Sequence, residues 1–186
     1  MPEIEDLSGP LNQHLKFEDF SKGALLRLIG AWQFAWLQQT EAWYSVLKER
    51  LGSEVADACE LAAWLQLEQR VGKRYAQAAN IQLNTVEDSL KLLQVRLDNT
   101  TGGFYEQYYE FKTPNHVIWT THRCCSLEYF EKKAPERIVP VCHVLEPAVI
   151  AKALNNPRIK VTALKLPPRK SPQEFPCCQW ELKIEE

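Results

Sequence analysis

The sequence contains none of the short motifs that mark common enzyme classes. It has no glycine-rich phosphate loop, no dinucleotide fingerprint, and neither a His-Glu-x-x-His nor a Gly-x-Ser-x-Gly motif. It also lacks an apolar run of the about 20 residues that a membrane-spanning helix needs. The reaction class therefore cannot be inferred from a motif, and we expect no membrane association.

Charge of one sign is also lacking, since the formal net charge is only −2. Such a balance gives no general attraction to nucleic acid or to acidic membranes. A local basic run extends over residues 158–170, but it has no interleaved aromatic side chains for stacking on bases. We interpret its members as a solvated sheet edge: Arg158, Lys160, Lys165, Arg169 and Lys170.

The N-terminal stretch MPEIEDLSGP has neither the basic nor the apolar region of a secretory signal. Six cysteines in a chain of this length are better interpreted as reduced thiols than as a disulfide framework. We therefore expect a cytoplasmic protein.

The first half of the chain predicts three helices after an acidic lead-in over residues 1–20. Ser21 is a suitable N-cap for a helix over residues 22–50, and Gly52 ends it before a second helix over residues 54–79. A capping pattern at Thr85–Asp88 begins a third helix of about 12 residues.

Three tryptophans recur at helical spacing in the first of these helices: Trp32, Trp36 and Trp43. They could form an aromatic ligand box, but core packing is the more frequent reason for such a stripe, so we expect this helix to be covered on more than one side. We expect Cys59 of the second helix to be a buried structural thiol. Gly72 marks close packing or a bend.

In the second half, alternating and β-branched segments predict strands. The fold class is α+β, a three-helix part followed by a four-stranded antiparallel sheet with two short helices in the order β-β-α-α-β-β. The expected units are residues 1–20, 21–100 and 101–186, packed together as one compact unit. The expected strands are residues 104–111, 117–122, 158–166 and 177–184, and the short helices are residues 126–133 and 147–154.

The cysteines of the second half occur in three groups at the edges of these elements: Cys124-Cys125, Cys142-His143 and Cys177-Cys178. If the fold brings them together, they form a thiol-lined site. Zinc or another thiophilic metal is a candidate cofactor, although the paired C-x₂₋₄-C spacing of structural zinc sites is absent. The metal ligands would come from Cys124 or Cys125, Cys142 or His143, and Cys178, with His122 as a further option. The alternative is that these thiols are small buried apolar groups.

A cysteine nucleophile is a second hypothesis, because a neighbouring His or Arg can hold a thiol as its thiolate. Arg123-Cys124 and Cys142-His143 place a cation beside a thiol in sequence. Neighbours on a strand point to opposite faces, so adjacency alone does not make a catalytic pair.

The order of these features resembles a family of uncharacterised bacterial and archaeal proteins that is similar to the L-2-amino-thiazoline-4-carboxylic acid hydrolase-like proteins. The resemblance implies an α+β fold with a helical N-terminal part and no settled activity. Some relatives have a further cysteine before the double proline, where this chain has Leu166. The residues that carry the resemblance are Leu25–Ile29, Trp32, Tyr75–Ala78, Thr85, Arg123-Cys124, Cys142, Asn156–Ile159, Pro167-Pro168 and Cys178–Trp180.

The leading hypothesis is a small-molecule-binding protein with a cysteine-lined site between helices and sheet. The alternatives are a hydrolase of a small cyclic C–N substrate and a non-catalytic interaction subunit, with a homo-oligomer as one form of the latter. The expected ligand-binding residues are Arg123, Cys124, Cys142, Cys178 and Trp180. The expected metal ligands are Cys124, Cys142, Cys178 and His143, and Cys59, Cys125 and Cys177 are expected to be bystanders.

Overall fold

The computed structural model describes residues 3–96 and 103–185, and it confirms the predicted α+β class. The expected boundary between residues 100 and 101 lies outside the described residues. In chain order, the main elements are α1 (Lys22–Leu51), α2 (Ser53–Ala78), α3 (Val86–Gln94), β1 (Tyr105–Thr113), β2 (His116–Cys124), α4 (Cys125–Lys133), a π-helix (Pro140–Leu145), α5 (Glu146–Ala153), β3 (Ile159–Lys165) and β4 (Cys178–Ile184).

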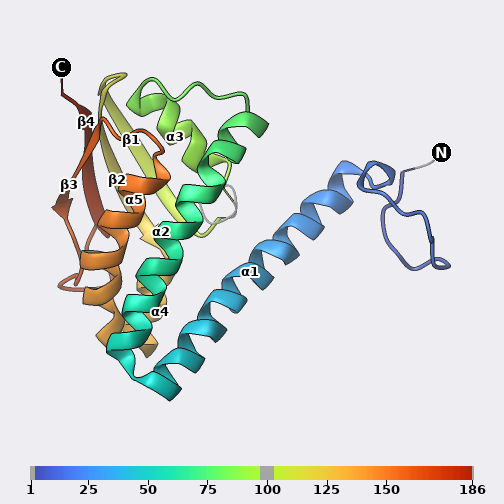
Figure 1. The fold of residues 1–186 in the computed structure, drawn as a ribbon, viewed down its shortest axis with the longest axis horizontal. Helices are drawn as coiled ribbons and strands as arrows, with labels where there is room; N and C mark the ends of the chain where they lie inside the picture. Colours follow the sequence, from blue (N-terminus) through green and yellow to red (C-terminus); the bar gives the residue numbers. More distant parts are fainter. Residues whose placement is uncertain (1–2, 97–102, 186) are drawn as a thin grey trace.

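The four strands form one antiparallel sheet in the order β1-β2-β4-β3. The helices α3 and α5 pack on one face of this sheet, with α2 beside them (Figure 1). The main core lies in this layer, because apolar side chains alternate along each strand and point toward the helices. Its members include Leu90, Trp119, Ile150, Leu154, Trp180 and Leu182.

The predicted ends of the N-terminal helices are close to the observed ones. The Ser21 hydroxyl accepts a hydrogen bond from the Ala24 backbone N–H at 3.1 Å, as an N-cap does. Gly52 has φ +87°, a conformation that favours glycine, where the chain turns from α1 into α2. Thr85 and Asp88 form the predicted capping box of α3.

The expectation that α1 is covered on more than one side is wrong. The helix leaves the rest of the molecule at an angle, and its N-terminal half stands apart (Figure 1). Trp32 is 46% exposed and Trp43 is 63% exposed. The apolar pattern indicates which side chains avoid water, but α2 is the main helix that packs on α1, and one neighbour cannot cover the whole helix.

Two features of α2 depend on its neighbours. Cys59 is exposed, so its expected burial is wrong: this part of α2 borders the open cleft beside α1. Gly72 does mark close packing, because an added Cβ would lie 3.2 Å from Cγ of Asn155. None of the helices in the described part is long and apolar enough to cross a membrane.

Candidate functional site

The three cysteines of interest lie on three different elements at one end of the sheet. Cys124 ends β2 and caps α4, and its sulfur accepts a hydrogen bond from the Leu127 backbone N–H at 3.4 Å. Cys142 lies in the π-helix, and Cys178 begins β4, where it pairs with Thr121 of β2. The sheet therefore fixes Cys124 and Cys178 on neighbouring strands, and the π-helix supplies the third thiol.

Packing brings Cys142 toward this end of the sheet. Cys124 and Cys142 both pack against a second apolar cluster. The buried residues of this cluster are Leu127, Phe130, Ile138, Val141 and Cys177. A π-helix is rare and often occurs at functional sites. Here it lies directly before α5, so Cys142 and Glu146 are four residues apart on one continuous helical stretch.

Glu146 connects the three thiols electrostatically. Burial is the main cause that raises the pKa of Cys124, Cys142 and Cys178, and the nearby Glu146 carboxyl raises each of them further. The pKa of Cys142 rises to about 12. Cys178 in turn raises the pKa of both other thiols. The thiols are therefore neutral at physiological pH, and an anion formed on any of them would be repelled by the same carboxyl.

Neutral hydrogen-bonding groups surround these thiols. The Thr121 hydroxyl and the Trp180 indole N–H hydrogen-bond to Cys178, and both lower its pKa against the effect of burial. Tyr105 pairs with Cys124 across the β1–β2 ladder. Burial raises the pKa of Tyr105 well above its usual range, and Cys124 and Glu146 raise it further. Tyr105 is thus a further polar residue near the thiols.

Cys177, expected to be a bystander, contacts a cation. Its buried thiol donates a hydrogen bond to the His122 carbonyl at 2.9 Å, and Nη1 of Arg169 lies 3.6 Å from its sulfur. Glu131 holds Arg169 through two hydrogen bonds of 2.9 and 2.5 Å. The Arg169 side chain is only 4% exposed, so its assignment to a solvated edge is wrong. The loop between β3 and β4 folds back toward α4, a long-range contact that a local charge pattern does not reveal.

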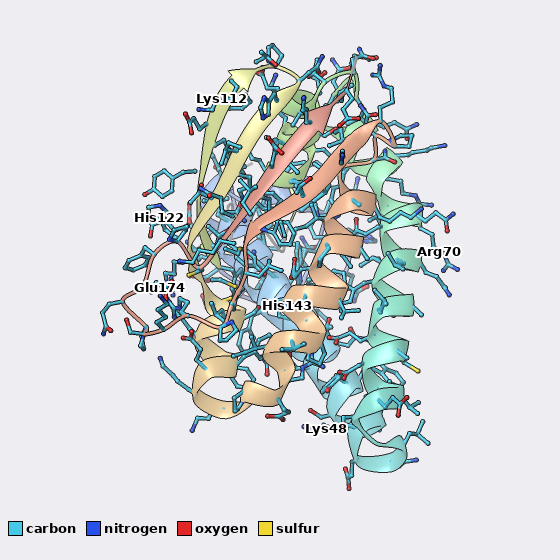
Figure 2. All side chains as sticks on the ribbon, turned by 90° about the vertical axis from the view of Figure 1, so that its left-hand side faces the viewer. Lys48, Arg70, Lys112, His122, His143 and Glu174 are labelled. Atoms are coloured by element: carbon cyan, nitrogen blue, oxygen red, sulfur yellow. The ribbon has the colours of Figure 1, made fainter. Side chains whose placement is uncertain are left out.

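The other predicted site residues lie in different surroundings. Arg123 is exposed and pairs with Glu128 at 3.3 Å. Trp180 is buried in the main core, where its indole N–H reaches Cys178. His143 is exposed, and its Nε2 lies 2.5 Å from the Pro167 carbonyl. His122, labelled in Figure 2, lies on β2, and its ring is tilted against the rings of Tyr108 at 4.5 Å and Phe175 at 6.0 Å.

Metal coordination has no preformed geometry in the part of the chain that is described. No group of three or more His, Cys, Asp or Glu side chains there is arranged to hold a metal ion. Thiolate sulfur and carboxylate oxygen are both donor types that zinc accepts, so Cys124, Cys142, Cys178 and Glu146 are the residues that could hold such an ion.

Fold and site together define an α+β protein with a helical N-terminal part and half-buried thiols at one end of an antiparallel sheet. The chain belongs to a family of unknown function (DUF6125), whose model matches residues 18–184. No curated protein and no solved structure matches the chain. Membership in this family is therefore the part of the resemblance that is shown, and no named relative supports the likeness to the hydrolases.

Proposed function

We propose that this protein binds a small thiophilic ligand at a site formed by Cys124, Cys142, Cys178 and Glu146. One observation carries the proposal: thiols from three separate segments share an electrostatic interaction with the same carboxyl group. Apolar packing alone does not require an acid beside three half-buried thiols.

The chemistry of these groups favours a soft cation or an electrophilic small molecule. Each group becomes anionic when it ionises, and each disfavours the ionisation of the others. A thiophilic cation reverses this relation, because it stabilises the thiolates and the carboxylate together. Zinc is a suitable probe, and its binding would draw the side chains into a closer arrangement than they have in the free protein.

The test is a titration of reduced, chelator-treated protein with Zn²⁺ and with Cd²⁺. Charge-transfer absorption of Cd²⁺ reports the thiolates that bind it. We expect about one equivalent of ion per chain, and loss of at least tenfold in affinity when Cys142→Ser removes one ligand. Cys59→Ser is the matched control, because Cys59 is exposed on α2 and lies outside the site. Equal affinities of the two variants, or no thiolate signal, would contradict metal binding at this site.

Hydrolysis of a small cyclic C–N substrate with a cysteine nucleophile is the second candidate. Glu146 favours it, since a carboxylate beside a thiol can accept the thiol proton. The raised thiol pKa values disfavour it, because they keep the nucleophile protonated. The two functions predict opposite effects of removing the charge of Glu146 on the reactivity of Cys142. A measurement of that reactivity therefore distinguishes them.

A further inference from the structure

A cleft lined by tryptophans opens where α1 and α2 diverge from the turn at Gly52 (Figure 1). Its volume is about 490 Å³, a size at which pockets commonly hold small molecules. Trp36 and Trp43 line it from α1, and Trp64 lines it from α2. The rings of Trp36 and Trp64 lie nearly perpendicular, at 87°, with centroids 5.4 Å apart. Trp43 is 63% exposed, so burial in a core does not explain this large aromatic side chain.

One acidic side chain, Glu60 of α2, also lines the cleft and is only 12% exposed. Its Oε1 accepts a hydrogen bond from Nη2 of Arg137 at 2.9 Å, and Nη1 of the same guanidinium lies 3.3 Å from Asp57. Burial is the main cause that raises the pKa of Glu60, Arg137 lowers it, and the carboxylates of Glu41 and Asp57 raise it further. The surroundings of Glu60 therefore carry three carboxylates and one cation, an excess of negative charge.

Arg137 shows how side chains of this kind stabilise a cation. Its guanidinium lies 3.4 Å from the centroid of the Tyr44 ring, between that ring and two carboxylates, and its side chain is 4% exposed. An aromatic face attracts a cation through its quadrupole, and tryptophan does so most strongly. The cleft offers the same two components, a carboxylate and aromatic rings, and none of its described lining residues is a lysine or an arginine.

We propose that the cleft between α1 and α2 binds a small quaternary ammonium compound. The carboxylate of Glu60 supplies the opposite charge, and the tryptophan rings contact the alkyl groups on the nitrogen.

The lining favours an alkylated nitrogen over a primary ammonium. A primary ammonium is strongly hydrated and needs several hydrogen-bond acceptors in place of water. Few acceptors line the cleft, and the Thr40 hydroxyl already donates to the Trp36 carbonyl at 3.1 Å. A quaternary nitrogen has no hydrogen to donate, so aromatic and aliphatic contacts suit it better.

The experiment is a titration of isotope-labelled full-length protein with choline at constant ionic strength. Neohexyl alcohol, in which carbon replaces the charged nitrogen, is the uncharged control ligand. Indole N–H signals in NMR spectra report each of the six tryptophans separately. We expect choline to shift the signals of the three tryptophans in the cleft and to bind at least about tenfold more tightly than the alcohol. The remaining three serve as internal references: Trp32, Trp119 and Trp180.

Two matched pairs of variants assign the contacts. Glu60→Gln should weaken choline binding at least about tenfold, because it removes the opposite charge. Asp57→Asn removes the same charge beside Arg137 but lies outside the cleft lining, so its effect should be several times smaller. Trp43→Leu should weaken binding at least about threefold, whereas Trp32→Leu, also at an exposed position on α1, should leave it unchanged. Far-UV circular dichroism verifies that each variant folds.

Several outcomes would overturn the proposal. Equal affinities for choline and the alcohol would show an apolar cleft without preference for charge. Absence of shifts with either compound would exclude binding, and equal losses in Glu60→Gln and Asp57→Asn would remove Glu60 as a contact. Signals of the cleft tryptophans that move with protein concentration alone would assign the cleft to a contact between copies. The proposal does not depend on the thiol site.

Discussion

At the scale of single residues, ionisation is the property that separates the two candidate functions. A free cysteine acts as a nucleophile only as its thiolate, and Cys142 has its pKa raised to about 12 by burial and by neighbouring acids. The fraction of thiolate at neutral pH is therefore very small. A bound cation would change this balance, whereas a hydrolase would need a proton acceptor beside the thiol.

Replacement of Glu146 by glutamine tests this distinction. In the binding protein, loss of the carboxylate removes a repulsion, so the pKa of Cys142 falls and alkylation by iodoacetamide becomes faster, by about threefold for half a pKa unit. In the hydrolase, the same variant removes the base and alkylation becomes slower. The measurement is the alkylation rate of Cys142 between pH 7 and 10, followed by peptide mass spectrometry in the presence of a chelator.

The control for this comparison is Glu131→Gln. Its carboxylate holds Arg169 beside Cys177, and it contributes less to the pKa of Cys142 than Glu146 does. A rate at Cys142 that changes equally in both variants would show that general loosening of the structure, rather than the charge of Glu146, controls the thiol.

At the scale of elements, α2 depends on a close contact with the turn after α5. Gly72 is buried in α2, and Asn155 occupies a left-handed conformation with φ +50° in that turn. Three atoms of the Asn155 side chain lie 3.2–3.4 Å from the position of an added Cβ at Gly72. Helix propensity alone would favour alanine over glycine at position 72. The close contact with Asn155 has the opposite effect, because it leaves no room for an alanine Cβ.

Gly72→Ala should lower the free energy of unfolding by about 1 kcal/mol, since overpacking outweighs the propensity gain. In the background of Asn155→Gly the same change should stabilise the protein by about 1 kcal/mol, because the crowding atoms are gone and glycine suits the positive φ. Urea unfolding of the wild type, the two single variants and the double variant measures whether Gly72→Ala raises or lowers the free energy of unfolding in each background. Stabilisation by Gly72→Ala in the wild-type background would refute the steric argument.

The elements differ in how well local sequence predicts them. Ser21, Gly52 and the Thr85–Asp88 box act within one turn of the chain, and the structure has all three where they were expected. The exposure of Trp43 and the burial of Arg169 depend on which distant segment lies opposite, and local patterns carry no such information. Cys142 and Glu146 are near each other because they lie four residues apart on one continuous helical stretch, whereas the sequence indicated only a short apolar segment at Cys142.

At the scale of the whole molecule, buried hydroxyls and thiols make the fold sensitive to alkaline pH. Tyr109 packs against the main core and its pKa is raised from 10.0 to about 12 by burial. The unfolded chain therefore releases this proton at lower pH than the folded one. The stabilising contribution is complete below pH 10 and is lost as the pH rises toward 12.

Tyr109→Phe should make the loss of stability between pH 10 and 12 less steep, by no more than about 1.4 kcal/mol per pH unit. Thermal or urea unfolding at several pH values measures the slope. The absolute stability also changes, because the variant loses a hydrogen bond of 3.0 Å to Gln107, so the slopes are compared. Tyr129→Phe is the control, since Tyr129 is exposed. Identical slopes for Tyr109→Phe and the wild type would contradict the conclusion that the raised pKa of Tyr109 contributes to the loss of stability at alkaline pH.

The π-helix has a consequence for how this site can change over evolutionary time. A π turn contains one residue more than an α turn, so a single-codon deletion within Pro140–Leu145 would convert it to an ordinary helix. The upstream part would then rotate by about 100° relative to α5, whereas Cys142 and Glu146 would stay within one helical turn of each other. Chain length, as much as residue identity, therefore determines how α4 and the residues before the π-helix are oriented relative to α5 in a descendant of this protein.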